Sequence, residues 1–88
     1  MVHNVSMTKI VFLGWLKDTA GSAERQVTLP AMTTAEELIS FVADGDQILA
    51  EELAEPSIRI IINKSILLDQ ILPETIEEVA FMPPLSGG

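Results

Sequence analysis

The chain has 88 residues, of which 48% are hydrophobic, and its 13 acidic residues against 5 basic ones give a formal net charge of −8. This length suits one small domain, and the apolar content argues for a packed core rather than disorder. The negative charge argues against nucleic acid as a ligand and favours partners with basic docking surfaces.

Residue types and sequence patterns that the chain lacks exclude further kinds of site and location. The chain contains no cysteine, which excludes disulfides, thiolate metal sites and thiol catalysis, and no metal site is predicted. The longest apolar runs, such as residues 60–62, are far too short to span a membrane. No signal-peptide pattern is present, so we expect a cytoplasmic protein without membrane contact.

The first predicted elements form a hairpin. Residues 1–6 are expected to be a disordered leader before a folded domain at residues 7–82. Residues 9–13 predict a strand with two apolar faces, one on the core and the other covered by a further surface. Residues 14–22 are typical of a hairpin loop, and residues 24–29 alternate as the antiparallel partner strand. The side chains expected on one face of that strand are Arg25, Val27 and Leu29.

Helical signals follow the hairpin. Thr34 and Glu37 have the spacing of a capping box, which predicts a helix through about residue 42, and Gly45 is a natural helix stop. Residues 47–55 predict a second helical turn or two, which Pro56 ends. The side chains expected to share the inner face of the first helix are Leu38, Phe41 and Val42. Those expected to point inward from the second are Ile48, Leu49 and Leu53.

Three further strands are predicted in the last third of the chain. The strands are expected at 58–63, 66–68 and 79–82. A tight turn at 63–65 links the first strand to the short second one, and a connection at 69–78 precedes the last. In the last strand Val79 and Phe81 share one face. Because a hairpin, a helix and a returning C-terminal strand leave only one crossover helix, we predict an α+β fold. It is a mixed sheet with one main helix packed across one face.

The last strand runs directly into the sequence PPLSGG, residues 83–88. Proline fixes φ and has no amide donor, so the two prolines should end the sheet and keep the segment extended. Glycine has no Cβ, so the Gly-Gly end can enter a slot too narrow for any other residue. The sequence therefore predicts an extended functional C-terminal Gly-Gly tail at residues 83–88, with its chemistry at the carboxylate of Gly88.

The closing sequence EVAFMPPLSGG, residues 78–88, resembles the signature of the molybdopterin synthase small subunit, a MoaD-type sulfur carrier of the MoaD/ThiS family. The strand at residues 9–13 and the helix from Thr34 fit the same pattern in the same order. The resemblance implies a ubiquitin-like β-grasp fold whose terminal carboxylate carries sulfur. An activating enzyme would use ATP to form an acyl-adenylate on Gly88, and a sulfur donor would convert it to a thiocarboxylate. No cofactor would bind the chain directly.

The resemblance also implies the partners. Sulfur would pass to cyclic pyranopterin monophosphate in molybdenum cofactor biosynthesis, within a heterotetramer of two small and two MoaE-type large subunits. The activating enzyme would be an E1-like, MoeB-type adenylyltransferase, and the sulfur source a sulfurtransferase or cysteine desulfurase. Residues matching apolar positions that face the large subunit are Leu13, Ile66 and Met82. Residues that would insert into its active site are Pro83, Pro84, Leu85, Ser86 and Gly87.

Two positions depart from the family pattern. An Asp-Gly-Asp-like turn is common before the last strand, but here residues 74–77 have the sequence ETIE, so the turn must differ. Met82 stands where a second aromatic residue is common, which makes the docking surface softer and more adaptable.

Other functions fit the same tail. A ubiquitin-like protein modifier would be conjugated through Gly88 to lysines of its targets, and a sulfur carrier of the thiamin pathway would share the fold and the activation. An interaction domain with an inert tail is also open. The product distinguishes a sulfur carrier from a protein modifier: sulfur on the free chain, or covalent adducts on other proteins.

Overall fold

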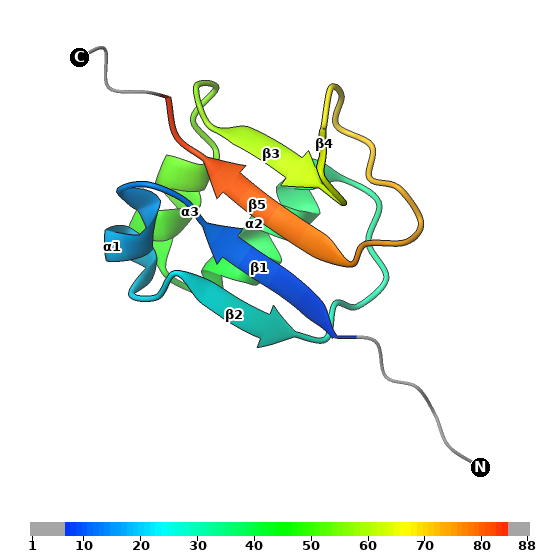
Figure 1. Ribbon diagram of the computed structural model, residues 1–88, viewed down its shortest axis with the longest axis horizontal. Helices are drawn as coiled ribbons and strands as arrows, with labels where there is room; N and C mark the ends of the chain where they lie inside the picture. The colour runs from blue at the N-terminus through cyan, green and yellow to red at the C-terminus, as the bar shows by residue number, and fades with distance from the viewer. Residues whose placement is uncertain (1–6, 85–88) are drawn as a thin grey trace.

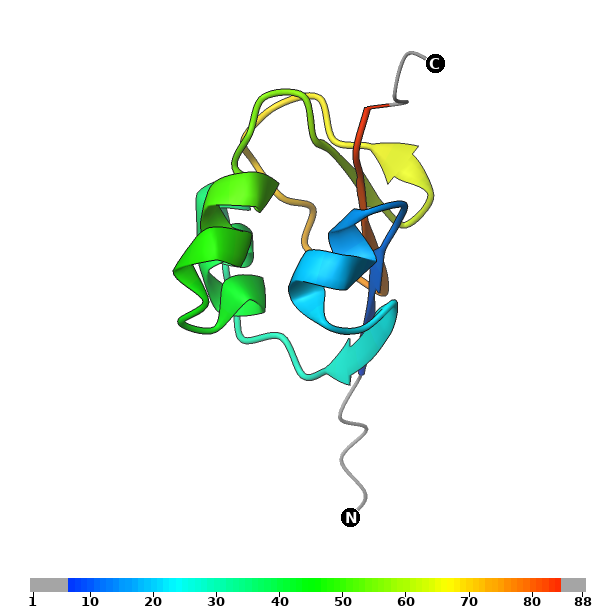
Figure 2. The same ribbon diagram turned by 90° about the vertical axis from the view of Figure 1, so that its left-hand side faces the viewer.

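The computed structural model describes residues 7–84, so the predicted leader and residues 85–88 lie outside the described residues. The elements are β1 (Thr8–Phe12), α1 (Leu16–Ala20), β2 (Glu24–Val27), α2 (Ala35–Ala43), α3 (Gln47–Leu53), β3 (Arg59–Ile62), β4 (Ser65–Ile66) and β5 (Glu78–Met82). A five-stranded mixed sheet of order β2-β1-β5-β3-β4 carries the helices on one side (Figures 1 and 2). The predicted α+β architecture is confirmed. None of the helices in residues 7–84 has the length and apolar character needed to cross a membrane.

The core lies between the sheet and the helices, and alternation along the two central strands creates it. Ile10 and Phe12 of β1 and Val79 and Phe81 of β5 are all buried on the helical side, as their spacing predicts. Phe12 and Phe81 are register partners of parallel strands, and their ring centroids lie 5.9 Å apart in a stacked arrangement. This aromatic pair joins the centre of the sheet to the helical layer.

Arg25 of β2 links the β1–β2 hairpin to helices α1 and α2. Its guanidinium lies 5.0 Å from the centroid of the Phe12 ring. It donates hydrogen bonds to the carbonyl oxygens of Ala20 at 2.6 Å and Val42 at 3.3 Å, and to the Ser22 hydroxyl at 3.1 Å. Ala20 ends α1 and Val42 lies in the last turn of α2, so the cation meets the negative ends of both helix dipoles.

The predicted capping box at the start of α2 is confirmed. The backbone N–H of Glu37 donates to the Thr34 hydroxyl at 3.2 Å, and the backbone N–H of Thr34 donates to the Glu37 carboxylate at 3.1 Å. The backbone N–H of Thr33 donates to the same carboxylate oxygen at 2.8 Å. The hydrogen bonds from Thr33 and Thr34 hold the pKa of Glu37 below its usual value.

This cap predicts a specific acid sensitivity. The pKa of Glu37 is lowered in the folded chain, so its contribution to stability is present above the usual carboxyl pKa and is lost as pH falls through the lowered pKa. Glu37→Gln should therefore melt lower than wild type at neutral pH, and the difference should shrink in acid. Thermal melts across the acid range measure this. Glu36→Gln is the matched control, because it removes a charge from the same turn but no capping bond; an equal pH response in both variants would contradict the prediction.

Residues 14–22 are more ordered than the predicted loop, since they contain α1. Leu16 has no exposed surface, which draws this turn onto the core. Gly21 ends the helix with φ of 82°, and its N–H donates to the Lys17 carbonyl. The segment joins the two strands of the hairpin as predicted, but it is not a loop throughout, because the buried Leu16 holds a helical turn against the core.

Further predictions differ in detail from the structure. Phe41 and Ile48 were expected to point inward, yet they are 36% and 66% exposed, because α2 and α3 bury narrower stripes that include Leu38 and Leu49. β2 ends at Val27 rather than residue 29, and β4 covers Ser65–Ile66 rather than 66–68.

The predicted tight turn is confirmed as the link between β3 and β4. Asn63 and Lys64 have φ of 51° and 72°, and Ile62 pairs with Ser65 across the turn. Positive φ at both loop residues is the pattern of a type I′ hairpin turn, which suits asparagine. The Asn63 amide also donates to the Thr75 carbonyl at 2.8 Å, which fixes the connection before β5.

Candidate functional site

The candidate site begins where β5 ends. β5 pairs with β1 in parallel and with β3 antiparallel, so the strand leading to the tail is supported on both sides. The backbone N–H of Leu13 donates to the Phe81 carbonyl at 3.0 Å, and Met82 pairs with Arg59 of β3. A site carried on a central strand is held more rigidly than one on a loop.

Pro83 is held by the domain from which the tail leaves. It is buried, whereas Pro84 is exposed. A Cβ built on Gly14, the residue that follows Leu13, would lie 2.9 Å from Cγ of Pro83. The described chain therefore stays against its own domain through Pro83 and leaves it at Pro84. The predicted insertion of Pro83 into a partner stays a prediction, and in the described structure Pro83 lies buried at the base of the tail.

The remaining predicted tail residues, Leu85, Ser86, Gly87 and Gly88, lie outside the described residues. The geometry of the site therefore ends at Pro84. Among residues 7–84, no three His, Cys, Asp or Glu side chains lie close enough to hold a metal ion.

Figure 2 shows that one face of the sheet is turned away from the helices. Apolar side chains of adjacent strands lie on this face and form the open-face patch. Val11, Ala80, Ile61 and Ile66 form one cross-strand row, since each is a register partner of the next. Such partners lie on the same face of the sheet, with Cβ atoms about 5 Å apart. The patch consists of Val11, Leu13, Ile61, Ile66, Ala80 and Met82, all partly buried or exposed.

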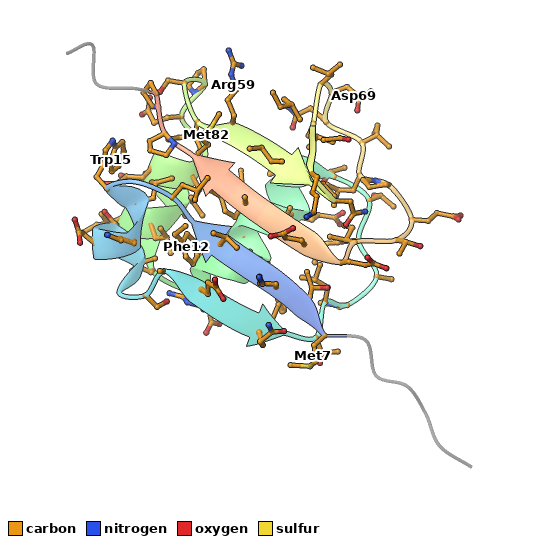
Figure 3. The ribbon with its side chains drawn as sticks, viewed as in Figure 1. Met7, Phe12, Trp15, Arg59, Asp69 and Met82 are labelled. Atoms are coloured by element: carbon orange, nitrogen blue, oxygen red, sulfur yellow. The ribbon has the colours of Figure 1, made fainter. Side chains whose placement is uncertain are left out.

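The predicted docking residues all lie on this patch but not all together. Leu13 and Met82 lie at the end of β1 and β5, next to the base of the tail, and Figure 3 shows Met82 and the exposed Trp15 at this end. Ile66 lies on β4, two strands away from β5, and is 50% exposed. Leu13 is 37% exposed and Met82 is partly buried by its neighbours.

Sequence reasoning missed the middle of the patch. Val11, Ile61 and Ala80 connect the predicted residues into one surface, and strand alternation carried the signal for all three. Residues 7–84 supply no layer over this face, so the covering surface expected for the outer face of β1 does not come from the described domain.

Charged residues surround the patch. Lys9 pairs with Glu78 on the side of the sheet distant from the tail, Glu24 flanks Val11 on β2, and Arg59 flanks Met82 on β3. These charges are exposed or partly exposed. An apolar centre with a charged rim is the usual composition of a protein-docking surface.

A hollow in the described structure lies away from the tail. It has a volume of about 760 Å³ and is lined by residues at the start of β1 and before β5, including Thr8, Ile76 and Glu77. β1 and β5 are parallel, and the tail leaves from their C-terminal ends. This hollow therefore lies at the opposite, N-terminal ends of the two strands. It is not part of the candidate site.

Comparisons with known proteins agree with this geometry. Residues 10–88 match the sequence profile of the ThiS family. The crystal structure of SAMP1 from Haloferax volcanii has a TM-score of 0.75 at 18% identity, covering 94% of this chain and 100% of that one. The solution structure of small archaeal modifier protein 1 from Methanosarcina acetivorans has a TM-score of 0.66 at 23% identity, covering 98% and 100%.

A putative molybdopterin converting factor subunit 1 from Pyrococcus furiosus has a TM-score of 0.63 at 19% identity, covering 91% of this chain and 99% of that one. A search of curated proteins gave no match. The superpositions confirm the predicted ubiquitin-like β-grasp fold, and at these identities they show the fold alone.

Proposed function

Because this chain belongs to the ThiS family, we propose that it is a sulfur carrier whose Gly88 carboxylate is adenylated and then converted to a thiocarboxylate. The acceptor system in this proposal is molybdopterin synthase, in which the sulfur passes to cyclic pyranopterin monophosphate. The observation that carries the proposal is that the family match extends to residue 88, so it includes the Gly-Gly end.

The chemistry of the tail supports this role. A carboxylate is ionised at neutral pH and is a poor electrophile. When its oxygen attacks the α-phosphorus of ATP, pyrophosphate leaves and the acyl carbon gains AMP as a leaving group. When the outer sulfur of a donor's persulfide attacks the acyl carbon, AMP leaves and an acyl disulfide forms. A second thiol from the donor system then attacks the donor's own sulfur, which releases the thiocarboxylate on Gly88 and leaves a disulfide on the donor. Glycine leaves the acyl carbon unhindered, and without cysteine the chain has no thiol to compete for the adenylate.

The other catalytic groups must come from partners. The proposed partners are an E1-like adenylyltransferase, a sulfurtransferase or cysteine desulfurase, and the large subunit of molybdopterin synthase. The open-face patch adjoins the base of the tail through Leu13 and Met82, so one partner could hold the patch and receive residues 84–88 at once. The formal charge of −8 favours a partner with basic residues around that surface.

A ubiquitin-like protein modifier is the second candidate. Two structures that share this fold are named as small archaeal modifier protein 1, which is the observation that favours this reading. Both functions begin with adenylation of the terminal glycine, and the thiamin-pathway carrier shares that step. They differ in what receives the activated end.

One experiment separates these functions. The chain is incubated with ATP, a candidate activating enzyme and a sulfur donor, and its intact mass is measured. A sulfur carrier gains the mass of sulfur in place of oxygen on the free chain, and added large subunit with cyclic pyranopterin monophosphate returns it to the starting mass. Lysine-linked adducts on other proteins would support the modifier instead. The same spectrum verifies that Gly88 is the last residue of the mature chain.

Met82→Asp tests the docking surface. A carboxylate at this position places a charge at the end of the open-face patch next to the tail, beside Leu13, and leaves the core residues untouched. Binding to the large subunit should weaken by about tenfold or more, with thermal stability close to wild type. Isothermal titration and thermal melts measure the two effects. Ile48→Asp is the control: it adds the same charge at an exposed apolar residue of the helical layer, and an equal loss of affinity there would contradict the assignment.

A further inference from the structure

Gly14 and Pro83 meet at the point where the chain leaves the sheet. Gly14 has φ of 56°, and a Cβ there would approach Cγ of Pro83 to 2.9 Å, closer than side-chain carbons come in folded proteins. Pro83 is buried and Pro84 is exposed. The opposing atom belongs to a proline ring, which cannot rotate away as a flexible side chain can.

The backbone around this contact is fixed on both sides. Leu13 donates its N–H to the Phe81 carbonyl at 3.0 Å, so the turn after β1 is tied to β5 immediately before the prolines. Proline holds its own φ and restricts the residue before it, so Pro83 followed by Pro84 forms a stiff extended unit. A displacement of Pro83 therefore also displaces Pro84, because rotation at the bonds between them is too restricted to compensate.

We propose that Gly14 is a positioning residue for the tail: by having no Cβ, it lets Pro83 seat on the β1–α1 turn and so sets the direction in which Pro84 leaves the domain. This inference rests on the proposed function, because the direction matters only if the end of the chain must reach a partner's active site. Orientation of a reacting group strongly affects rate, and a displacement of about 1 Å can cost up to about a hundredfold.

The chain offers matched controls for the glycine. Gly21 has φ of 82° and Gly45 has φ of 88°, and a Cβ at either would meet nothing within 4 Å. Gly21→Ala and Gly45→Ala therefore impose the same kind of backbone strain as Gly14→Ala without a collision. The comparison separates the effect of the missing Cβ on Pro83 from the general preference for glycine at positive φ.

The first measurement reads the tail directly. Because the chain has no native cysteine, spin labels at Ser86→Cys and at Ser40→Cys on α2 report a single distance distribution by pulsed electron resonance. Gly14→Ala should shift this distribution, whereas Gly21→Ala and Gly45→Ala should leave it at the wild-type position. In a chain that also carries Pro83→Ala, Gly14→Ala should cause little further shift of the distance distribution, because the opposing proline ring is absent.

The second measurement reads the chemistry, using sulfur loading of Gly88 in the unlabelled protein. Gly14→Ala should lower kcat/KM by about tenfold or more, mainly through kcat, because the docking patch is intact. Gly21→Ala and Gly45→Ala should stay near wild type. Far-ultraviolet circular dichroism verifies the fold. If Gly14→Ala does not fold, Pro83→Gly takes its place: it removes the ring, and an unchanged distribution would count against the proposal.

Two results would overturn the proposal. One is a Gly14→Ala distribution and loading rate that match those of the control glycines. The other is an equal effect of Gly14→Ala in the wild-type background and in the Pro83→Ala background, which would show that Gly14 acts through its own backbone. If wild-type protein accepts no sulfur, the proposed function fails, but the distance measurement still decides whether this contact aims the tail.

Discussion

A protein extended by one alanine after Gly88 is expected to accept no sulfur while melting at the wild-type temperature. The added peptide bond turns the Gly88 carboxylate into an amide, so the oxygen that would attack ATP at this residue is no longer available. The new terminal carboxylate belongs to a residue with a Cβ, which a slot shaped for glycine excludes. The core lies between the sheet and the helices, away from this end, so stability should not change.

The matched control carries the same alanine at the other end of the chain, before Met1. It has the same composition and length as the C-terminal variant, and it should load sulfur at the wild-type rate. Intact mass verifies that each extension is still present after incubation with the activating enzyme. Sulfur loading of an intact C-terminal extension would show that the reaction does not depend on a free Gly88, and the proposed function would then be wrong.

Much of the fold could be predicted because local signals and burial agree. The capping box at Thr34, the positive-φ turn at Asn63 and the alternation of β1 and β5 each depend on neighbouring residues, and each is confirmed. Phe41 and α1 could not be placed in this way. Whether Phe41 faces the core depends on the angle at which α2 crosses the sheet, and the helical turn at Leu16 depends on space under β1.

The candidate site shows a similar division. A tail, and an apolar face on the strands that support it, can be read from the sequence, since prolines, glycines and alternation are local features. The contact between Gly14 and Pro83 could not, because it joins residues far apart in the chain through a parallel strand pair. The register that places Ile66 in one row with Val11 also follows only from the strand order.

Phe81→Ala is expected to cause the largest loss of stability. Phe81 has no exposed surface, stacks on Phe12 at 5.9 Å and pairs with Ile60 of the adjacent strand. Truncating a buried phenylalanine to alanine costs about 3–5 kcal/mol of unfolding free energy, through lost transfer energy and the cavity that remains. A domain of 88 residues has a total stability of roughly 5–13 kcal/mol. The variant should therefore be marginally folded or unfolded at physiological temperature.

Phe41→Ala is the control, because it makes the same truncation at a phenylalanine of α2 that is 36% exposed. It should cost much less, about 1 kcal/mol. Urea unfolding followed by the single tryptophan, Trp15, measures both variants. Equal losses would contradict the position of Phe81 at the centre of the core.

Molecules of Phe81→Ala that remain folded keep Gly88 and should still be adenylated. The C-terminal extension, in contrast, should keep its stability and lose the sulfur-loading reaction. This opposite pair of outcomes is expected only if the β-grasp domain supports the tail and the reaction takes place at its end.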